Sequence, residues 1–266
     1  MYALTALASG GVTVVAGGTD VYPALVGRDV PAAILDISKI DELHGIATTP
    51  DGLRIGAGVT WAEVADAGLP PGLLALQQAA LQVGAVQVQK AGTVAGNLCT
   101  ASPAGDGIPA LLALDARIEL CSARGTRVLP LDEFVTGYRA TAKAADELVA
   151  AIVIPREATE RVSSFVKLGT RAYLVISLAM VAASVGRDDR GRVSSARVAV
   201  GACSPVARRL ASVEASVLTG EPVRVSAEDL RELSPIDDIR CSANYRLDVV
   251  PELVRRALAD CGVDVA

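Results

Sequence analysis

The chain has 266 residues, 51% of them hydrophobic and 21% charged, which is typical of globular proteins and excludes a disordered one. Its formal net charge of −5, with Lys and Arg scattered along the chain, argues against a nucleic-acid surface. No apolar run reaches the roughly 18 residues that a membrane helix needs, and the first residues lack the pattern of a secretory signal. We therefore expect a cytoplasmic protein that contacts neither nucleic acid nor membrane.

The cysteine and histidine content bears on metal chemistry. Iron–sulfur clusters need four clustered thiolates and zinc sites need comparable pairs, whereas the five cysteines are widely spaced: Cys99, Cys121, Cys203, Cys241 and Cys261. The single histidine, His44, has no partner for a triad and is interpreted as a surface or strand-end residue. We expect neither catalytic nor metal-ligating residues, so that any chemistry comes from a bound organic cofactor.

The first third of the chain is predicted to alternate strands and helices. Residues 12–16 form a β-branched run that ends in Gly17-Gly18-Thr19-Asp20, where Asp20 can cap a helix starting at Val21. Thr60-Trp61-Ala62-Glu63 has the pattern of a capping box and predicts a helix to about residue 67. Further strands are expected at 33–37 and 53–55, and a further helix at 73–83.

A glycine-rich region over residues 92–97 and a small-residue stretch over 101–109 follow, and Pro109 suits the first turn of a helix to about residue 114. A polar segment at 187–192 reads as a hairpin turn. The remaining predicted elements are strands at 117–121, 127–129, 148–154, 163–168, 178–185 and 193–200, and helices at 206–218 and 244–259. The pattern predicts an α+β fold with a first domain over 1–158, divided at about 1–56 and 57–158, and a sheet-and-helix domain over 159–266.

Two glycine-rich segments carry the clearest functional signal. At Gly17 and Gly18 the missing side chains let backbone N–H groups approach an anion, although an ordinary tight turn has the same composition. The segment from Gly92 to Asn97 adds a hydroxyl and an amide, but surface loops share this composition too. Neither segment has the lysine of a nucleotide-binding P-loop or the G-x-G-x-x-G of a Rossmann unit. The residues alone indicate a dinucleotide-like ligand held by two glycine loops.

In three motifs the sequence resembles the FAD-binding subunits of molybdenum hydroxylases, a family that includes the carbon monoxide dehydrogenase medium subunit and the xanthine dehydrogenase flavin domain. The motifs span essentially the whole chain, and the spacing of the first two also fits. They are Ala16-Gly17-Gly18-Thr19-Asp20 with Ile34-Leu35-Asp36-Ile37, Ala91-Gly92-Thr93-Val94-Ala95-Gly96-Asn97-Leu98 with Ala101-Ser102-Pro103-Ala104-Gly105-Asp106, and Phe165-Val166-Lys167-Leu168 with Arg171.

The resemblance implies a two-part α/β FAD-binding domain of the PCMH type, followed by a C-terminal domain as in carbon monoxide dehydrogenase flavoproteins. It implies that the first loop, with Thr93, Gly96 and Asn97, holds the pyrophosphate of FAD, and that Ser102 and Asp106 bind nearby polar parts. Val149 and Lys167 match positions close to the isoalloxazine, where a cationic Lys167 favours the anionic reduced flavin; a solvated strand-edge lysine is the alternative. The implied cofactor-binding residues are Ala16, Gly17, Gly18, Thr19, Asp20, Val21, Gly92, Thr93, Ala95, Gly96, Asn97, Ser102, Ala104, Asp106, Val149 and Lys167.

The resemblance also implies partners. A large subunit would carry the molybdopterin and hydroxylate the substrate, and a small subunit would carry two [2Fe–2S] clusters. Electrons would reach FAD on this chain and leave to NAD, oxygen or another acceptor. One face near the second loop should then be an interface, with Leu98 and Ile108 as candidates; both are equally consistent with the core.

Three departures from the family pattern bear on flavin binding. Gln89-Lys90 replaces an Arg-Asn pair, Ala95 replaces a glycine, and about ten residues stand in for the opening strand and helix. A methyl group at a backbone–phosphate contact is expected to weaken FAD binding. Two alternative functions therefore stay open: a flavin-free binding or maturation protein, and a free-standing flavin oxidase. The oxidase would need a base such as Tyr138, Tyr173 or Tyr245, each of which also reads as a packed aromatic.

Overall fold

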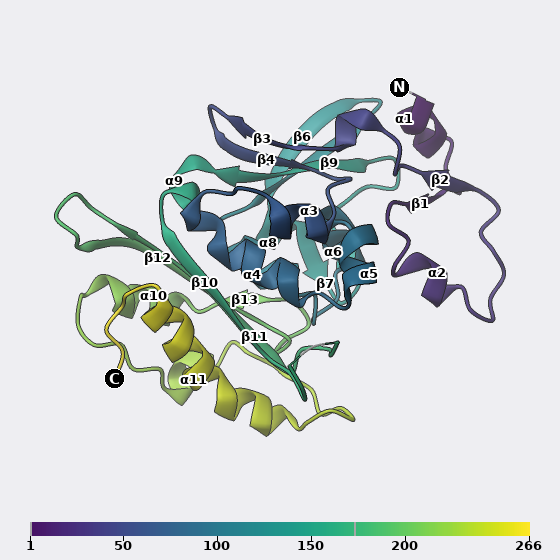
Figure 1. Cartoon of the computed structure of the whole chain (residues 1–266). Coiled ribbons are helices and arrows are strands. Elements are labelled where there is room, and N and C mark those ends of the chain that lie inside the picture. Colours follow the sequence, from purple (N-terminus) through teal and green to yellow (C-terminus); the bar gives the residue numbers. More distant parts are fainter. Residues whose placement is uncertain (1, 173) are drawn as a thin grey trace.

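The computed structural model describes residues 2–172 and 174–266. Within these residues the strands form a five-stranded sheet, a four-stranded sheet and two strand pairs. Helices fill the space between the two large sheets, and two further helices cover the outer face of the four-stranded sheet (Figure 1). The predicted α+β fold is confirmed.

The N-terminal segment lies at one side of the molecule (Figure 1). Its two short strands pair in parallel, with Thr13 opposite Ile34 and Val15 opposite Asp36. Asp20 stands at the N-cap of the helix that follows the first strand, as predicted, but its side chain makes no capping hydrogen bond. The elements are α1 (Tyr2–Ala8), β1 (Thr13–Val15), α2 (Val21–Ala24) and β2 (Ile34–Asp36).

The five-stranded sheet is antiparallel throughout, in the order β3-β4-β9-β5-β6. Its strands are β3 (Ile46–Thr49), β4 (Gly52–Gly56), β5 (Arg117–Ser122), β6 (Gly125–Pro130) and β9 (Leu148–Pro155). The four strands predicted at 53–55, 117–121, 127–129 and 148–154 are all present, whereas β3 was not predicted. Because β4 pairs with β9, the segments before and after residue 57 share one sheet.

A group of helices packs beneath this sheet. The capping box is confirmed: Thr60 Oγ1 accepts a hydrogen bond from Glu63 N at 3.2 Å, and Glu63 Oε2 accepts one from Thr60 N at 2.7 Å. The prediction of a glycine loop over 92–97 is wrong beyond Thr93, because Val94 begins a helix. The helices are α3 (Trp61–Asp66), α4 (Leu74–Gln82), α5 (Val86–Ala91), α6 (Val94–Thr100) and α7 (Gly107–Ala113).

Short elements connect these layers. A strand pair and two single-turn helices flank the sheet, and three 3₁₀ turns lie in the connections. They are α8 (Leu131–Phe134), β7 (Val135–Gly137), β8 (Ala140–Thr141), α9 (Arg156–Thr159), and the turns at Asp41–Leu43, Pro71–Leu73 and Ala227–Leu230.

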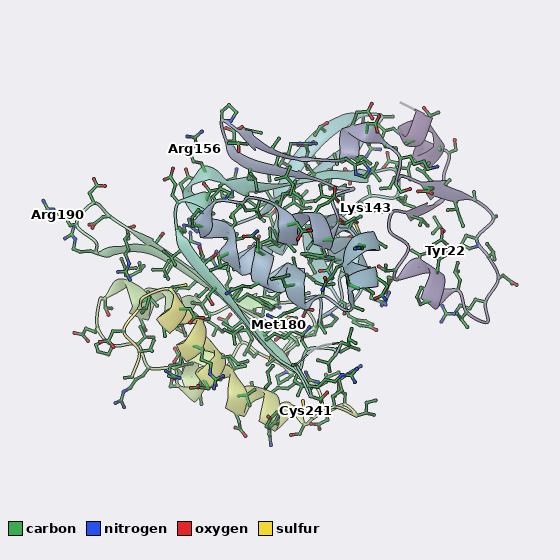
Figure 2. The ribbon with its side chains drawn as sticks, viewed as in Figure 1. Tyr22, Lys143, Arg156, Met180, Arg190 and Cys241 are labelled. Atoms are coloured by element: carbon green, nitrogen blue, oxygen red, sulfur yellow. The ribbon has the colours of Figure 1, made fainter. Side chains whose placement is uncertain are left out.

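The four-stranded sheet is antiparallel, in the order β10-β11-β12-β13, and the predicted turn at 187–192 carries Arg190 to the tip of its longest hairpin (Figure 2). Its elements are β10 (Val162–Leu168), β11 (Ala179–Arg187), β12 (Val193–Gly201), β13 (Arg208–Arg209), α10 (Ala211–Leu218) and α11 (Ala243–Asp260). The helix predicted from residue 206 begins only at Ala211, because Arg208 and Arg209 pair with β12.

Both faces of this sheet are covered, so its central strand is apolar on both sides. Val181 and Val185 of β11 pack in the cluster beneath α10 and α11, whereas Met180 and Ala182 point into the cluster shared with the five-stranded sheet. This division of β11 side chains is the period-two alternation of a strand buried on both faces. One continuous core therefore joins the FAD-type domain predicted over 1–158 to the following residues.

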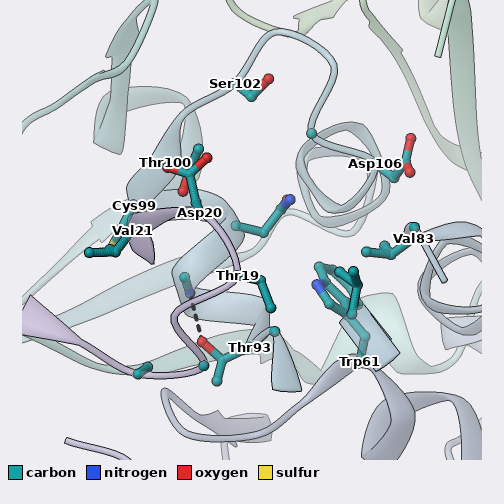
Figure 3. Close-up of a pocket in the computed structure, with 18 of the residues that line it drawn as sticks. Thr19, Asp20, Val21, Trp61, Val83, Thr93, Cys99, Thr100, Ser102 and Asp106 are labelled. Atoms are coloured by element: carbon teal, nitrogen blue, oxygen red, sulfur yellow. Dashed lines mark hydrogen bonds between the residues drawn. The ribbon is translucent and has the colours of Figure 1, made fainter. Parts of the chain in front are cut away.

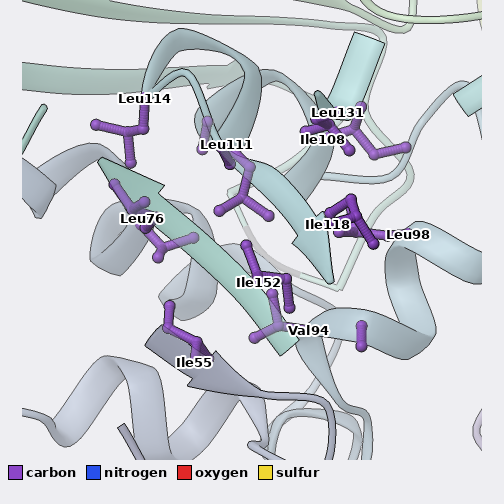
Figure 4. Packing of buried hydrophobic residues seen from close by; sticks show 14 of the residues in the cluster. Ile55, Leu76, Val94, Leu98, Ile108, Leu111, Leu114, Ile118, Leu131 and Ile152 are labelled. Atoms are coloured by element: carbon purple, nitrogen blue, oxygen red, sulfur yellow. The ribbon is translucent and has the colours of Figure 1, made fainter. Parts of the chain in front are cut away.

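Leu98 and Ile108, considered above for a partner interface, lie in this shared core. Leu98 is fully buried and Ile108 is 4% exposed, and both pack among aliphatic side chains of the helices and the sheet (Figure 4). Of the two alternatives left open for these residues, the structure supports the core. An apolar residue after a glycine-rich segment is here a core residue of a helix.

A charged junction also links the two halves of the chain. Asp115 follows α7 in the left-handed region (φ 53°) and accepts hydrogen bonds from Arg161 at 2.8 Å, Arg197 at 2.8 Å and Arg209 at 3.3 Å. Burial opposes ionisation of Asp115, but hydrogen bonds from Arg197 and Arg161 outweigh it, so the pKa of this carboxyl is lowered.

Among residues 2–172 and 174–266, no helix is both long and apolar enough to cross a membrane. In the same described residues, no group of three or more His, Cys, Asp or Glu side chains is placed to hold a metal ion.

Candidate cofactor site

A cavity of about 780 Å³ opens where the N-terminal segment meets α5, α6 and α7. Its volume lies in the range of about 300–1,000 Å³ usual for ligand sites. Figure 3 shows Asp20, Val21, Cys99 and Thr100 close together at the left of the cavity and Trp61 and Val83 at the right, with Thr19 and Thr93 between them. Apolar and hydroxyl-bearing side chains thus share the lining.

The loop Ala16–Asp20 reaches the cavity because it lies directly against the end of α5. A Cβ atom added to Gly17 would lie 1.7 Å from the carbonyl oxygen of Ala91, so that only glycine permits this backbone contact. Gly18 has φ +68° and the Tyr22 ring covers it, so that an added Cβ would lie 2.4 Å from Tyr22 Cε2. These two glycines are therefore dictated by backbone geometry and by the close approach of neighbouring groups.

The second wall is the start of α6. Thr93 Oγ1 accepts a hydrogen bond from Gly96 N at 3.0 Å and caps the helix (Figure 3). Backbone hydrogen bonds from Trp61 N to Gly92 O and from Val94 N to Val59 O, at 3.1 and 3.0 Å, fix this cap against α3. Sequence composition suggested a glycine-rich loop here, whereas the structure has a capped helix end.

A bidentate ion pair stands at the edge of the cavity. Arg139 donates to both carboxylate oxygens of Asp20 at 3.1 and 3.2 Å, although 119 residues separate them. Both side chains line the cavity and are about half exposed. The pair holds the N-terminal loop to the β7–β8 turn, and nothing in the sequence spacing pointed to Arg139.

Asp106 is a buried residue of the cavity wall, and the C-terminal half of the chain fixes it there. Lys167 Nζ of β10 lies 2.7 Å from Asp106 Oδ2, and Ser177 Oγ donates to Asp106 Oδ1 at 2.6 Å. Burial raises the pKa of the Asp106 carboxyl and Lys167 opposes this rise. Lys167 is 6% exposed, so the alternative of a solvated strand-edge charge is wrong.

The predicted residues fall into two groups. Thirteen of them line the cavity: Ala16, Gly17, Gly18, Thr19, Asp20, Val21, Gly92, Thr93, Gly96, Asn97, Ser102, Ala104 and Asp106. The other three do not line it. Ala95 and Val149 are buried in the core, and Lys167 stands behind Asp106. The Ala95 methyl group therefore points away from the cavity, and the weakening expected from it has no structural basis.

Several lining residues were not predicted: Val14, Trp61, Val83, Gly84, Val88, Cys99, Thr100, Arg139, Leu174, Val175 and Ile176, together with Gly105, which was quoted only as part of a motif. Most of them belong to elements far apart in the sequence that only the fold brings together. Tyr138 and Tyr245 are exposed and line no part of this cavity, so they are not the packed aromatics expected; Tyr173 lies outside the described residues. His44 is on the surface as predicted, with Nε2 3.0 Å from Ser38 O.

One buried polar atom bears on the ligand. Asn97 Oδ1 is buried and has no hydrogen-bond partner within the described structure. It lies beside Gly105 and Gly107, where an added Cβ atom would come within 3.2 Å of it. Buried polar atoms are normally paired with a hydrogen-bond partner. A buried polar atom that lacks one often faces the position of a ligand or water. A narrow backbone-lined cradle, several hydroxyls and apolar walls fit an elongated cofactor with polar and aromatic parts.

The comparisons with known proteins agree with this geometry. Residues 1–157 match the family described as the FAD binding domain in molybdopterin dehydrogenase, and residues 164–261 match the CO dehydrogenase flavoprotein C-terminal domain. The chain is 30% identical over 255 residues to the xanthine dehydrogenase FAD-binding subunit of Escherichia coli O157:H7, covering 92% of this chain and 87% of that subunit.

Two further relatives extend the comparison. The nicotinate dehydrogenase FAD-subunit of Eubacterium barkeri is 37% identical over 183 residues, which cover 67% of this chain and 62% of that subunit, less than two thirds of its length. The structure also resembles carbon monoxide dehydrogenase from Hydrogenophaga pseudoflava lacking the Mo-pyranopterin moiety. That match has a TM-score of 0.88 and 26% identity, and it covers 100% of this chain and 95% of the other. The chain thus belongs to the family of FAD-binding subunits of molybdenum hydroxylases.

Proposed function

We propose that this chain is the electron-transfer subunit of a molybdenum hydroxylase complex. Electrons reach its FAD from [2Fe–2S] clusters on a small partner subunit and leave to NAD, oxygen or another acceptor. A molybdopterin-binding large subunit oxidises the substrate. The relatives support this division, since they are named as FAD subunits of dehydrogenases and not as whole enzymes.

The observation that carries the proposal is the construction of the cavity wall from both halves of the chain. The loop Ala16–Asp20 and the start of α6 supply a narrow cradle, and Lys167 and Ser177 fix Asp106 from the C-terminal side. FAD supplies the chemistry of carrying two electrons between different donors and acceptors. The protein's part is to bind and orient the cofactor.

Particular residues are assigned to parts of that task. Thr93, Gly96 and Asn97, with the loop Ala16–Asp20, hold the pyrophosphate, because they offer hydroxyl, amide and close-lying backbone groups. Ser102 and Asp106 bind the polar parts farther along the cavity. Ala95, Val149 and Lys167 act from behind the wall by packing or by fixing a lining residue.

The test is anaerobic stopped-flow reduction of the assembled complex, with nicotinate, xanthine and carbon monoxide offered in turn as reductants. We expect that removing FAD leaves reduction of the iron–sulfur clusters unchanged and abolishes reduction of the acceptors, NAD and oxygen. Adding FAD back should restore reduction of the acceptors. Acceptor reduction that is indifferent to FAD would contradict the proposal and favour a flavin-free role. Substrate oxidation by the isolated chain would favour a free-standing oxidase.

A further inference from the structure

The contacts around Asp106 are unusual for a lining residue of a ligand site, since both carboxylate oxygens are already occupied. Lys167 Nζ is 2.7 Å from Oδ2, and Ser177 Oγ is 2.6 Å from Oδ1. The side chains of Asp106 and Lys167 are 8% and 6% exposed, so water screens this pair little. Ser177 is also buried.

Lys167 is itself held in place from another element. Its ammonium donates a second hydrogen bond to the carbonyl oxygen of Gln82, at the end of α4, at 3.1 Å. In the register of β10 and β11, Lys167 pairs with Met180, and this pairing fixes the direction of the Lys167 side chain. A strand and a helix end therefore position the ammonium before any ligand is considered.

From this arrangement we propose that Lys167 is a positioning residue for FAD: it keeps Asp106 ionised and oriented in the cavity wall, and does not itself touch the cofactor. This inference rests on the proposed function and adds to it the target of the Lys167 charge, which acts on Asp106 and not on the flavin. A buried carboxylate without its cation is costly and takes up a proton instead. Loss of Lys167 therefore converts Asp106 from an acceptor into a protonated acid that can donate.

The charged surroundings of Asp106 support the assignment. The elements packed around it bring Lys167 from β10 as the cation in contact and Ser177 from the β10–β11 connection as the hydroxyl in contact. The remaining ion pair of the cavity, Asp20 with Arg139, is neutral as a pair. Among the described residues, Lys167 is the cation that forms an ion pair with Asp106.

The first measurement is infrared spectroscopy of the apoprotein, which needs no bound flavin. In Lys167→Met we expect the band of a protonated carboxylic acid at pH 6 that fades as the pH rises, and that is absent from wild type and from the double variant Asp106→Asn/Lys167→Met. A Lys167→Met spectrum identical to that of wild type would overturn the inference. Because this readout is independent of FAD, it separates failure of the inference from failure of the proposed function.

The second measurement is the dissociation constant of FAD, from quenching of flavin fluorescence between pH 6 and pH 8.5. We expect no pH dependence for wild type, and at least ten-fold weaker binding for Lys167→Met at pH 6 that partly recovers as Asp106 ionises. Asp106→Asn should bind weakly at every pH, and adding Lys167→Met to it should cause no further loss, because the two residues act as a unit. Losses that multiply in the double variant would mean that Lys167 acts on FAD independently, contrary to the inference.

Two variants keep the test decisive if Lys167→Met fails to fold. The double variant Asp106→Asn/Lys167→Met has no uncompensated buried charge and should keep the wild-type circular dichroism spectrum. Ser177→Ala leaves the ion pair and removes one hydrogen bond, so its FAD affinity should fall only about two- to ten-fold, the effect of a single hydrogen bond. A Ser177→Ala loss as large as that of Asp106→Asn would show that the hydroxyl, and not the ammonium, controls Asp106.

Discussion

At the scale of single residues, the close approach at Gly17 is the most specific feature of the site. A methyl group there would lie 1.7 Å from a backbone oxygen of α5, which cannot move without displacing the helix. We expect Gly17→Ala to destabilise the fold by about 1–3 kcal/mol, as overpacking does, and to weaken FAD binding at least ten-fold. Denaturant unfolding and FAD titration check this.

The matched control for Gly17→Ala is Gly68→Ala. A methyl group at Gly68 would meet open space, and its backbone lies outside the left-handed region. This variant should unfold and bind FAD as wild type does. Equal losses in both variants would show that the loop contact with α5 has no special part in flavin binding.

Asp115 is the second residue from which a measurable effect follows. Asn suits its left-handed backbone as well as Asp does, so Asp115→Asn removes the charge without adding strain. Three arginines lose their shared carboxylate, and the amide nitrogen that replaces one of its oxygens cannot accept a hydrogen bond. We expect a loss of about 1–3 kcal/mol of unfolding free energy at pH 7, the usual cost of leaving partly buried polar groups unpaired.

The effect of Asp115 should depend on pH. Its pKa in the folded protein is lowered below the unfolded value of about 3.9. The stabilisation is therefore complete above about pH 4 and is lost as the pH falls through the folded pKa. Unfolding curves should show the difference between wild type and Asp115→Asn shrinking from pH 7 to pH 3; a constant difference would contradict this origin.

Among the helices and strands, α6 depends on its N-cap residue, and the effect of removing this cap can be predicted. Thr93 supplies the side-chain acceptor for Gly96 N at 3.0 Å. Thr93→Ala should cost about 0.5–2 kcal/mol, the usual value of an N-cap, and weaken FAD binding, whereas Thr93→Ser keeps the hydroxyl and should retain both. Calorimetry and flavin titration distinguish the two variants; an unchanged Thr93→Ala protein would mean that the cap is dispensable.

The same helix shows what the sequence could not reveal. Gly96 and Asn97 disfavour helix and favour loops, but Val94 and Leu98, one turn apart, are buried under the five-stranded sheet, and this packing overrides local preference. Conversely, Arg208 and Arg209 lie in the first turn of the helix predicted over 206–218 and instead pair with β12. The capping box at Thr60 and the polar hairpin at 187–192 were predictable, because each signal is local.

In the candidate site, too, local patterns could be predicted from the sequence and long-range contacts could not. The loops at Gly17 and Gly92 were visible as glycine-rich segments, and most of their residues line the cavity. Arg139 and the link from Lys167 to Asp106 depend on contacts 119 and 61 residues apart in the sequence. No local pattern encodes such contacts, and the family resemblance suggested Lys167 only in a different role, as a charge beside the flavin.

At the scale of the whole molecule, the two halves of the chain act on one cavity. Ala202 N donates to Pro103 O at 2.9 Å, so the end of β12 holds the loop that carries Ser102 and Ala104. Together with Lys167 and Ser177, this contact makes the candidate site a property of both halves of the chain. The shared hydrophobic core gives the same result, since it runs from Ile152 to Met180 without a break.

The most direct test is an FAD titration of the purified apoprotein, with the bound cofactor identified after denaturation, for wild type and Gly17→Ala. We predict that wild type takes up one FAD per chain and develops flavin absorption, and that Gly17→Ala takes up far less at the same concentration. Wild-type protein that retains no FAD after free cofactor is removed, alone and with its partner subunits present, would contradict the account.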